Sequence, residues 1–249
     1  MSELFNLRMK KLLPLLCVSL LSAVRAFGED QNLFNGKDLS GWEGNPAMWS
    51  VKDGVIRGQT QPSADNPKRS SLKHNTFLVW KGGTPGDFEL HAKFRITSEW
   101  GNSGIQYRSK VLEPGADGPI VSGYQADFES GKSYSGITYE ERGRGILAKR
   151  GEKVVIKADP ANAGKHKIEV VGSVGDSAAI QEAIHIQEWN DYVVIAKGNH
   201  LQQFINGKQT VDIVDEHEKA AKEGVIALQM HAGQPMVVEF KDLVLKSAK

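Results

Sequence analysis

Alternating apolar and polar residues, the period of a half-buried β-strand, recur along this chain. The clearest example is 88–96, where five apolar side chains fall on one face. The same alternation marks the segments 49–56, 104–109, 123–129, 136–139, 192–196, 201–205, 225–231 and 236–245. The pattern therefore predicts a protein built mainly from short β-strands.

Turn signals separate several of these segments. Asp53-Gly54 and Asn206-Gly207 are pairs that tolerate the positive φ angles of two-residue hairpin turns. Many short strands joined by tight turns favour an antiparallel sandwich or barrel over alternating strands and helices. We therefore expect an all-β fold.

The remaining segments suggest one domain with loops. The best helix-like segment is 216–222, and the segments 58–75 and 157–182 read as long loops or insertions. No stretch of the chain has the composition of a linker that would divide it. We expect residues 27–249 to form a single domain.

The N-terminus has the pattern of a secretory signal peptide. Basic residues precede the apolar run 12–21, and the small-residue stretch 22–26 follows it. The apolar run is about half the length that a membrane-spanning helix needs. We expect residues 1–26 to be removed, leaving an exported protein, periplasmic or secreted, with no membrane span.

Charge and cysteine content narrow the classes of function. The chain has 31 basic and 30 acidic residues, with no basic stripe of the kind that binds nucleic acid, so we expect no nucleic-acid partner. Cys17 is the only cysteine and lies in the predicted signal peptide. The mature domain therefore has no disulfide, and its stability comes from its hydrophobic core.

Candidate chemistry begins on the predicted strand 123–129. Its period of two places Gln125, Asp127 and Glu129 on one face and Tyr124 with its apolar neighbours on the other. A polar face is expected on any sheet exposed to solvent. The alternative is a face that lines a cleft.

Two further strands each offer a polar pair by the same alternation. Gln106 and Arg108 share a face on 104–109, and Gln229 and His231 share one at 225–231. Arg108 could hold a sugar oxygen or an oxyanion with its fixed fork of donors. His231 could exchange protons near neutral pH, or it could be a structural or surface histidine.

A charged cluster follows the predicted strand 136–139. Tyr139, Glu140 and Glu141 stand directly before Arg142 and Arg144. Guanidinium groups next to carboxylates could tune the pKa of a general base. The alternative is a solvated charged surface.

Trp80 is the remaining candidate, because it stands near a predicted loop where an indole ring could stack on the apolar face of a sugar. The sequence contains no zinc-ligand pattern, no phosphate-binding glycine loop and no serine nucleophile elbow. Spacing alone therefore does not identify a reaction.

Six sequence blocks stand in a characteristic order along the chain. They are 33–42 (LFNGKDLSGW), 77–83 (FLVWKGG), 101–109 (GNSGIQYRS), 122–127 (SGYQAD), 189–192 (WNDY) and 224–233 (GVIALQMHAG). Together they span nearly the whole predicted mature chain. This ordered set resembles the 3-keto-disaccharide hydrolase family. This chain carries Gln125 where many members carry glutamate.

The resemblance implies a concanavalin-A-like jelly-roll sandwich of two antiparallel sheets. It also implies cleavage of glycosides already oxidised at C3. The ketone acidifies the hydrogen on C2, a base removes it, the C1 substituent is eliminated, and water adds to the 3-keto-2-hydroxy-glucal. The alternative is a lectin-like module of the same architecture that binds glycans without reacting.

Roles for the candidate residues follow from this resemblance. We expect Asp127 or Glu141 to be the base, Arg108 and Gln125 to surround the ketone, and His231 and Tyr124 to assist. A divalent metal ion could stabilise the enolate. The 3-keto-glycoside would be the substrate, and a separate sugar 3-oxidoreductase could supply it. The other residues expected to bind substrate are Gln106, Gln229, Trp80, Tyr139 and Glu140.

Overall fold

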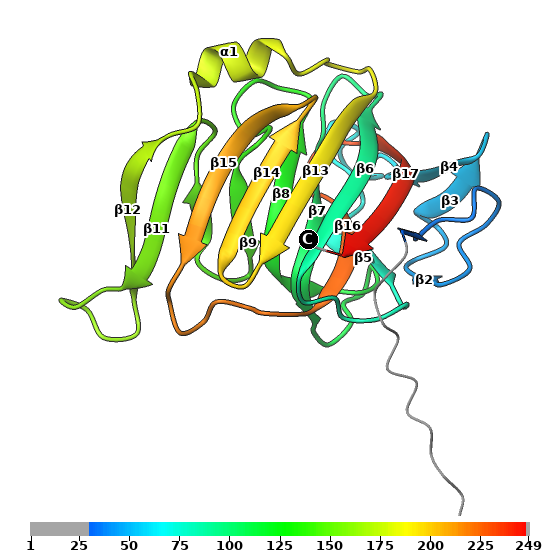
Figure 1. Ribbon diagram of the computed structural model, residues 1–249. Coiled ribbons are helices and arrows are strands. Elements are labelled where there is room, and N and C mark those ends of the chain that lie inside the picture. The colour runs from blue at the N-terminus through cyan, green and yellow to red at the C-terminus, as the bar shows by residue number, and fades with distance from the viewer. Residues whose placement is uncertain (1–29, 248–249) are drawn as a thin grey trace, which may run out of the picture.

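The computed structural model describes residues 30–247, which form two β-sheets packed face to face (Figure 1). The predicted signal peptide, residues 1–26, lies outside the described residues. Within residues 30–247, no helix has both the length and the apolar character needed to cross a membrane.

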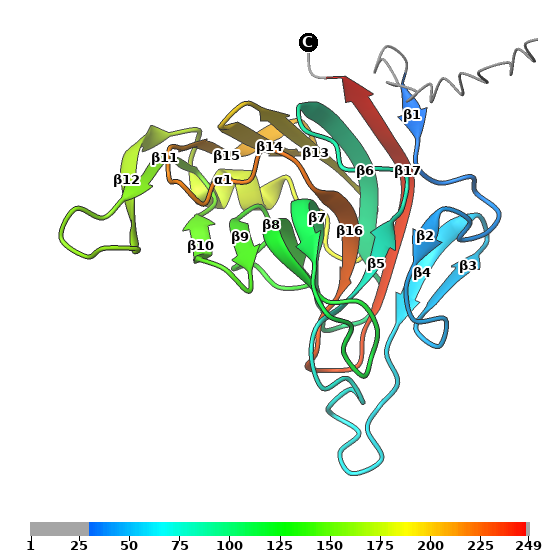
Figure 2. The same cartoon turned by 90° about the horizontal axis from the view of Figure 1, so that it is seen from below.

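The larger sheet has ten strands, in the order β12-β11-β15-β14-β13-β6-β17-β4-β3, with β1 paired to β17. Figure 2 shows it arching over the smaller sheet. Its strands are β1 Gln31–Asn32, β3 Trp49–Lys52, β4 Val55–Gln59, β6 Phe88–Ile96, β11 Glu152–Ala158, β12 His166–Ser173, β13 Asn190–Lys197, β14 His200–Ile205, β15 Lys208–Asp215 and β17 Val237–Ser247.

The smaller sheet has seven strands, in the order β10-β9-β8-β7-β16-β5-β2. Its strands are β2 Trp42–Glu43, β5 Thr76–Trp80, β7 Asn102–Val111, β8 Val121–Glu129, β9 Thr138–Glu141, β10 Gly145–Ala148 and β16 Val225–Met230. Neighbouring strands in both sheets run antiparallel, except that β11 and β15 of the described chain pair in parallel.

The predicted all-β sandwich of two sheets is confirmed, and the predicted strand 88–96 coincides with β6. Both predicted hairpin turns adopt positive φ angles, with Asn206 at 48° and Gly207 at 75°. Two local predictions were wrong. Residues 216–222 are not helical, and 157–182 is not a loop, because it contains β12 and the helix α1 Ser177–Glu182.

The core fills the space between the two sheets, where alternate residues of each strand point inward. Phe128 of β8 meets Phe94 of β6 at 3.9 Å between ring centroids, and Phe240 of β17 at 5.9 Å. The same alternation turns the intervening residues of β8 to the outer face of the small sheet, the face directed away from the large sheet. The candidate site lies on this outer face.

Candidate active site

A pocket of about 320 Å³ is open on the outer face of the small sheet. Its wall is formed by residues of strands β7, β8, β9, β10 and β16 and of loop segments of the chain. The lining residues are Asn75, Asn102, Gln125, Asp127, Tyr134, Ile137, Tyr139, Glu141, Ile146, Gln229 and His231.

Strand alternation brings the predicted polar residues into this pocket. Gln125 on β8 lies opposite Tyr139 on β9, and Asp127 and Glu141 follow two residues later on their own strands. Gln229 comes from β16, and His231 lies directly beyond the end of that strand. Six of the residues predicted from the sequence therefore line one pocket.

The polar side chains that β8 places on the floor of this pocket are buried. Gln125 is 2% exposed and Asp127 is 6% exposed. Buried polar groups lower stability unless they are hydrogen-bonded, and buried ionisable groups at a cleft are typical of functional sites. The interpretation of this face as an ordinary solvated surface is therefore wrong.

Gly104 makes room for the floor of the pocket. It pairs with Asp127 across the strands, and a Cβ atom there would lie 2.4 Å from Cγ of Gln125. Gln106, the next residue of β7 on the same face, is fully buried beneath the pocket, and its carboxamide lies 2.6 Å from Oε1 of Gln125. Gln106 therefore supports Gln125 and does not line the pocket itself.

Asp127 is the most deeply placed acid of the pocket. Its Oδ1 accepts hydrogen bonds from Nδ2 of Asn102 at 3.2 Å and from Nε2 of Gln125 at 3.3 Å. Burial raises the pKa of Asp127 well above its ordinary range, and these two hydrogen bonds only partly oppose the effect. A carboxylate with a raised pKa is a stronger base than an ordinary aspartate.

Glu141 is a second buried acid, 7% exposed. Its Oε2 accepts from Nδ2 of Asn75 and from Nε2 of Gln229, both at 3.3 Å. Burial raises the pKa of Glu141, against the effect of the hydrogen bond from Asn75 and the positive charge of Arg142. The pocket thus holds two carboxyl groups whose pKa values are both raised.

Two further titratable groups complete the polar lining. Burial lowers the pKa of His231, which favours its neutral form. Burial raises the pKa of Tyr139, and the charges of Glu141 and Asp127 raise it further. Tyr139 therefore keeps its proton and can donate a hydrogen bond.

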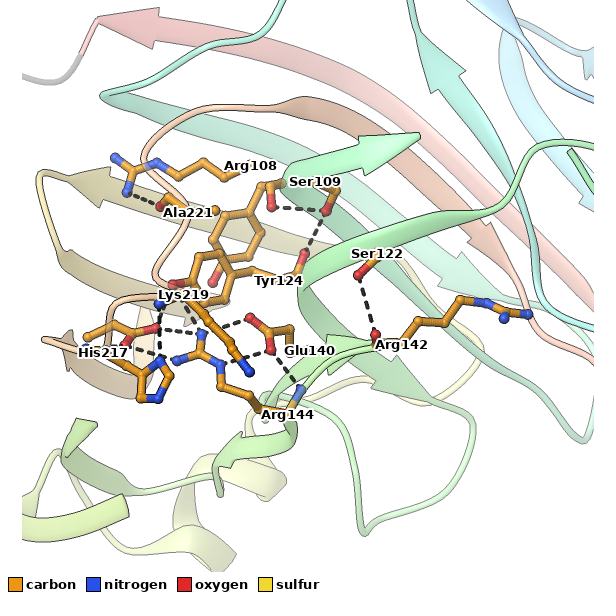
Figure 3. A network of polar contacts seen from close by, with 12 residues as sticks. Arg108, Ser109, Ser122, Tyr124, Glu140, Arg142, Arg144, His217, Lys219 and Ala221 are labelled. Carbon is orange, nitrogen blue, oxygen red and sulfur yellow. Dashed lines mark hydrogen bonds and ion pairs between the residues drawn. The ribbon is translucent and has the colours of Figure 1, made fainter. Parts of the chain in front are cut away.

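Arg108 lies elsewhere, so the prediction that it shares a face with Gln106 was wrong. The pairing of β7 with β8 shifts register between Tyr107 and Lys110, and Arg108 itself has φ 46°. This bulge turns its side chain away from the outer face. The guanidinium, 1% exposed, donates instead to Asp87 and to the carbonyl oxygens of Gly86 and Gly198. It also donates to the carbonyl oxygen of Ala221, the contact drawn in Figure 3.

Tyr124 and Glu140 lie on the inner side of the small sheet, as strand alternation requires. The hydroxyl of Tyr124 donates to Asp215 at 2.5 Å, and Arg144 forms ion pairs with Glu140 at 2.7 Å and with Asp215 at 2.6 Å. Figure 3 shows Tyr124, Glu140 and Arg144 in one buried network. This network is separate from the pocket, so the structure does not support roles for Tyr124 and Glu140 in substrate binding.

Trp80 is not available for stacking on a sugar. It is 4% exposed, pairs with Trp42 across β5 and β2, and belongs to the core. Its position near the end of β5 suggested a loop, but the pairing of β2 covers it. The expectation for Trp80 was therefore wrong.

Five further residues line the pocket without having been predicted from the sequence. Asn102 shares a face with Gly104 and Gln106 by strand alternation, so the period of two would have identified it. Asn75 and Tyr134 lie between strands, where no periodic signal exists. The other two are Ile137 and Ile146.

Residues 30–247 contain no group of three or more His, Cys, Asp and Glu side chains that could hold a metal ion. Asp127, Glu141 and His231 of the pocket therefore do not form a three-ligand group for the divalent metal ion considered from the sequence. We therefore derive no step of a reaction through a metal.

Residues 29–246 match the model of the 3-keto-alpha-glucoside-1,2-lyase-like domain. The chain belongs to this family. Its membership confirms the resemblance seen in the sequence and places this domain among proteins that act on carbohydrates. No curated protein sequence matches the chain significantly.

Solved structures similar to this family member share its sandwich fold. A protein of Parabacteroides distasonis assigned to the glycosyl hydrolases is 20% identical at a TM-score of 0.53, covering 88% of this chain and 94% of that one. Carbohydrate-binding module CBM66 of Bacillus subtilis is 12% identical at a TM-score of 0.50, covering 83% and 96%. A Bacillus subtilis protein with a galectin-like fold is 11% identical at a TM-score of 0.51, covering 88% and 94%. At these identities the likeness shows the concanavalin-A-like fold alone.

Proposed function

We propose that this protein is an enzyme that cleaves 3-keto-glycosides by elimination and then hydrates the product. The observation that carries the proposal is that Asp127 and Glu141, two buried carboxyl groups with raised pKa values, line the same pocket in a member of this family. A base and an acid are the two groups that such an elimination requires.

Asp127 is the proposed base. A ketone at C3 acidifies the C2 hydrogen, and transfer of that proton to Asp127 leaves an enolate at C2, C3 and O3. Collapse of the enolate restores the ketone, forms the C1–C2 double bond and breaks the bond from C1 to the leaving oxygen. Glu141 in its acid form gives a proton to that oxygen, so the leaving group departs as a neutral alcohol.

Neutral donors stabilise the enolate in this proposal. Arg108 cannot do so, because its donors are bound to backbone carbonyls and Asp87 outside the pocket. The pocket offers instead the carboxamides of Gln125 and Asn102 and the hydroxyl of Tyr139. Donors held in place before the reaction contribute most to stabilising a developing oxyanion.

Hydration completes the reaction. Water adds at C1 of the 3-keto-2-hydroxy-glucal, and a proton returns to C2 from Asp127. His231 lines the pocket, and its lowered pKa favours the neutral form, which accepts a proton from that water. Transfer of this proton through solvent to Glu141 restores the starting protonation state of the enzyme. The sum of both steps is hydrolysis of the glycoside.

We also propose where the enzyme works and which class of enzyme supplies its substrate. The signal-peptide pattern of residues 1–26 supports export, and hence work in the periplasm or outside the cell. The substrate must first lose two electrons and two protons at C3. A separate sugar 3-oxidoreductase is the class of enzyme that would supply it.

The decisive experiment incubates the purified mature domain with a 4-nitrophenyl 3-keto-glucoside and with the unoxidised glucoside. We expect release of nitrophenol from the keto substrate alone. In D₂O the sugar product should carry deuterium at C2, provided that the proton on Asp127 exchanges with solvent before C2 is reprotonated. A parallel reaction with a chelator should proceed at the same rate. Binding of the keto substrate without any release would instead support the lectin-like alternative.

Neighbouring glutamates provide a matched pair of variants. Glu141→Gln removes the proposed acid and should lower turnover about 100-fold for a 3-keto-glucoside of a simple alcohol, whose leaving oxygen needs a proton, and much less for the 4-nitrophenyl substrate. Glu140→Gln changes the preceding residue, whose side chain lies on the inner side of the sheet with Arg144, and should retain turnover. Equal losses in the two variants, in protein that remains folded, would contradict the assignment of Glu141.

A further inference from the structure

One side of the pocket is apolar. Ile146 comes from β10, Tyr139 from β9 and Ile137 from the residue before β9, while Tyr134 lies in the connection from β8 to β9. The amides and acids come mainly from β7, β8 and β16. Figure 2 shows β9 and β10 at one edge of the small sheet, so the apolar wall stands on that side of the pocket.

The apolar wall exposes large side chains. Tyr134 is 48% exposed and Ile146 is 40% exposed, although both line a pocket whose floor is buried. Single exposed apolar residues are normal on protein surfaces, whereas several gathered beside convergent polar groups are typical of a ligand site. A ligand that covered them would remove this apolar surface from water.

The loop that carries Tyr134 is held in place from two sides. Oε1 of Glu129 accepts from the backbone N–H groups of Ser133 at 2.5 Å and Tyr134 at 2.9 Å. Arg150 donates to the carbonyl oxygens of Ser135 and Lys132 at 2.7 and 2.9 Å. The exposed ring is therefore presented by an ordered backbone, so covering it costs little conformational entropy.

The backbone at Tyr134 is also joined to the pocket floor. The N–H of Gly136 donates to the carbonyl oxygen of Asp127 at 2.9 Å. On the edge strand, Ile146 pairs directly with Tyr139, which in turn pairs with Gln125. One cross-strand row thus runs from the apolar wall to the polar floor, and the two parts of the pocket are adjacent.

We propose that the apolar wall binds the leaving group, and that the substrates are 3-keto-glycosides of apolar, aromatic or alkyl alcohols. This inference rests on the proposed function. The keto sugar lies over Asp127 and Glu141, where amides and acids pair with its oxygens. Ile137 and Ile146 offer no hydrogen-bond partner, so a second sugar placed there would lose water from its hydroxyls without compensation. An aryl or alkyl group carries no such cost.

Methyl and benzyl 3-keto-glucosides test the inference, because methanol and benzyl alcohol are leaving groups of similar acidity. Both anomers are assayed, and a 3-keto-disaccharide serves as the polar comparison. The wild-type kcat/KM should be at least about tenfold higher for the benzyl than for the methyl substrate, since one methylene in an apolar pocket already changes this ratio by about that factor. The disaccharide should resemble the methyl substrate or fall below it.

Variants assign the preference to the wall. Ile146→Ser and Tyr134→Ser should each reduce the benzyl-to-methyl ratio of kcat/KM about tenfold. Val170→Ser is the matched control, because Val170 is an exposed valine on β12, outside the residues that line the pocket. It should leave the ratio unchanged. Thermal unfolding verifies that each variant is folded.

The outcomes separate the two proposals. The apolar leaving-group site is refuted if all keto substrates are cleaved with equal kcat/KM. It is also refuted if Ile146→Ser and Tyr134→Ser leave the benzyl-to-methyl ratio of kcat/KM unchanged. Neither result contradicts the proposed reaction. Cleavage of none overturns the proposed reaction. In that case, calorimetry measures the affinities of the benzyl and methyl keto-glucosides for the wild type and for Ile146→Ser. Equal affinities of the two ligands would refute the proposal that the apolar wall binds the leaving group.

Discussion

Replacing Arg144 with methionine tests the separation between the buried network and the pocket. The guanidinium of Arg144 reaches Asp215 at 2.6 and 3.0 Å and Glu140 at 2.7 and 2.8 Å. Burial alone would lower the pKa of Arg144, but the hydrogen bonds to Glu140 and Asp215 outweigh it and raise the pKa. The charge is therefore fixed in the folded protein.

The expected loss of stability follows from what remains after the substitution. The side chains of Glu140 and Asp215 are 11% and 1% exposed, so both carboxylates would stay buried without their cation. Removing one partner of a buried ion pair costs about 3–5 kcal/mol. The hydroxyl of Tyr124 still donates to Asp215, which places the loss at about 3 kcal/mol. For a domain of this size that corresponds to a Tm lower by roughly 6–12 °C.

Urea unfolding followed by tryptophan fluorescence measures the loss, and the triple variant with Glu140→Leu and Asp215→Leu is the control. Replacing a whole buried ionic group by apolar residues is often neutral, so the triple variant should regain stability relative to Arg144→Met, short of the Tyr124–Asp215 hydrogen bond that it also removes. Folded Arg144→Met should cleave the 3-keto-glucoside at the wild-type rate. An unfolding free energy within about 1 kcal/mol of wild type would refute the reasoning about this network, and loss of turnover in folded protein would refute its separation from the pocket.

Three further variants examine the pocket and its surroundings. Asp127→Asn should lower turnover at least about 100-fold, yet it should stabilise the fold. Burial raises the pKa of Asp127, so the wild type loses stability as pH rises above about 4 through the raised pKa. Denaturation at several pH values should show a smaller loss in Asp127→Asn, where only Glu141 of the two pocket acids still contributes to it. Tyr124→Phe removes the buried hydrogen bond to Asp215 and should cost about 1.5–3 kcal/mol in urea unfolding without reducing turnover. Gly104→Ala should displace Gln125 into the pocket, raising KM and costing about 1–3 kcal/mol, and unchanged KM would argue against this account of Gly104.

Side chains alternate between the two faces of a strand with a period of two, which is a local property of the chain. Most of the correct predictions rested on this period. It placed Gln125 and Asp127 together on β8 and turned Tyr124 to the opposite face, and the structure has this arrangement. The same rule failed at Arg108, because a bulge within β7 shifts the alternation. The bulge depends on the partner strand β8, which the local sequence of β7 does not encode by itself.

Burial was decided by segments far apart in the sequence. Whether the polar face of β8 was solvated or lined a cleft depended on Asn75, Tyr134 and the strands beside it, none of which contributes to the alternation of β8. The pairing of β2 with β5 likewise covered Trp80.

The sequence by itself determined an all-β protein, its family and the candidate acids Asp127 and Glu141. Alternation and ordered motifs depend only on the order of the residues. Only the tertiary structure decided which of those acids are buried together. The pKa of a carboxyl group is set by what surrounds it in space, and for Asp127 and Glu141 those surroundings come from several distant strands and loops.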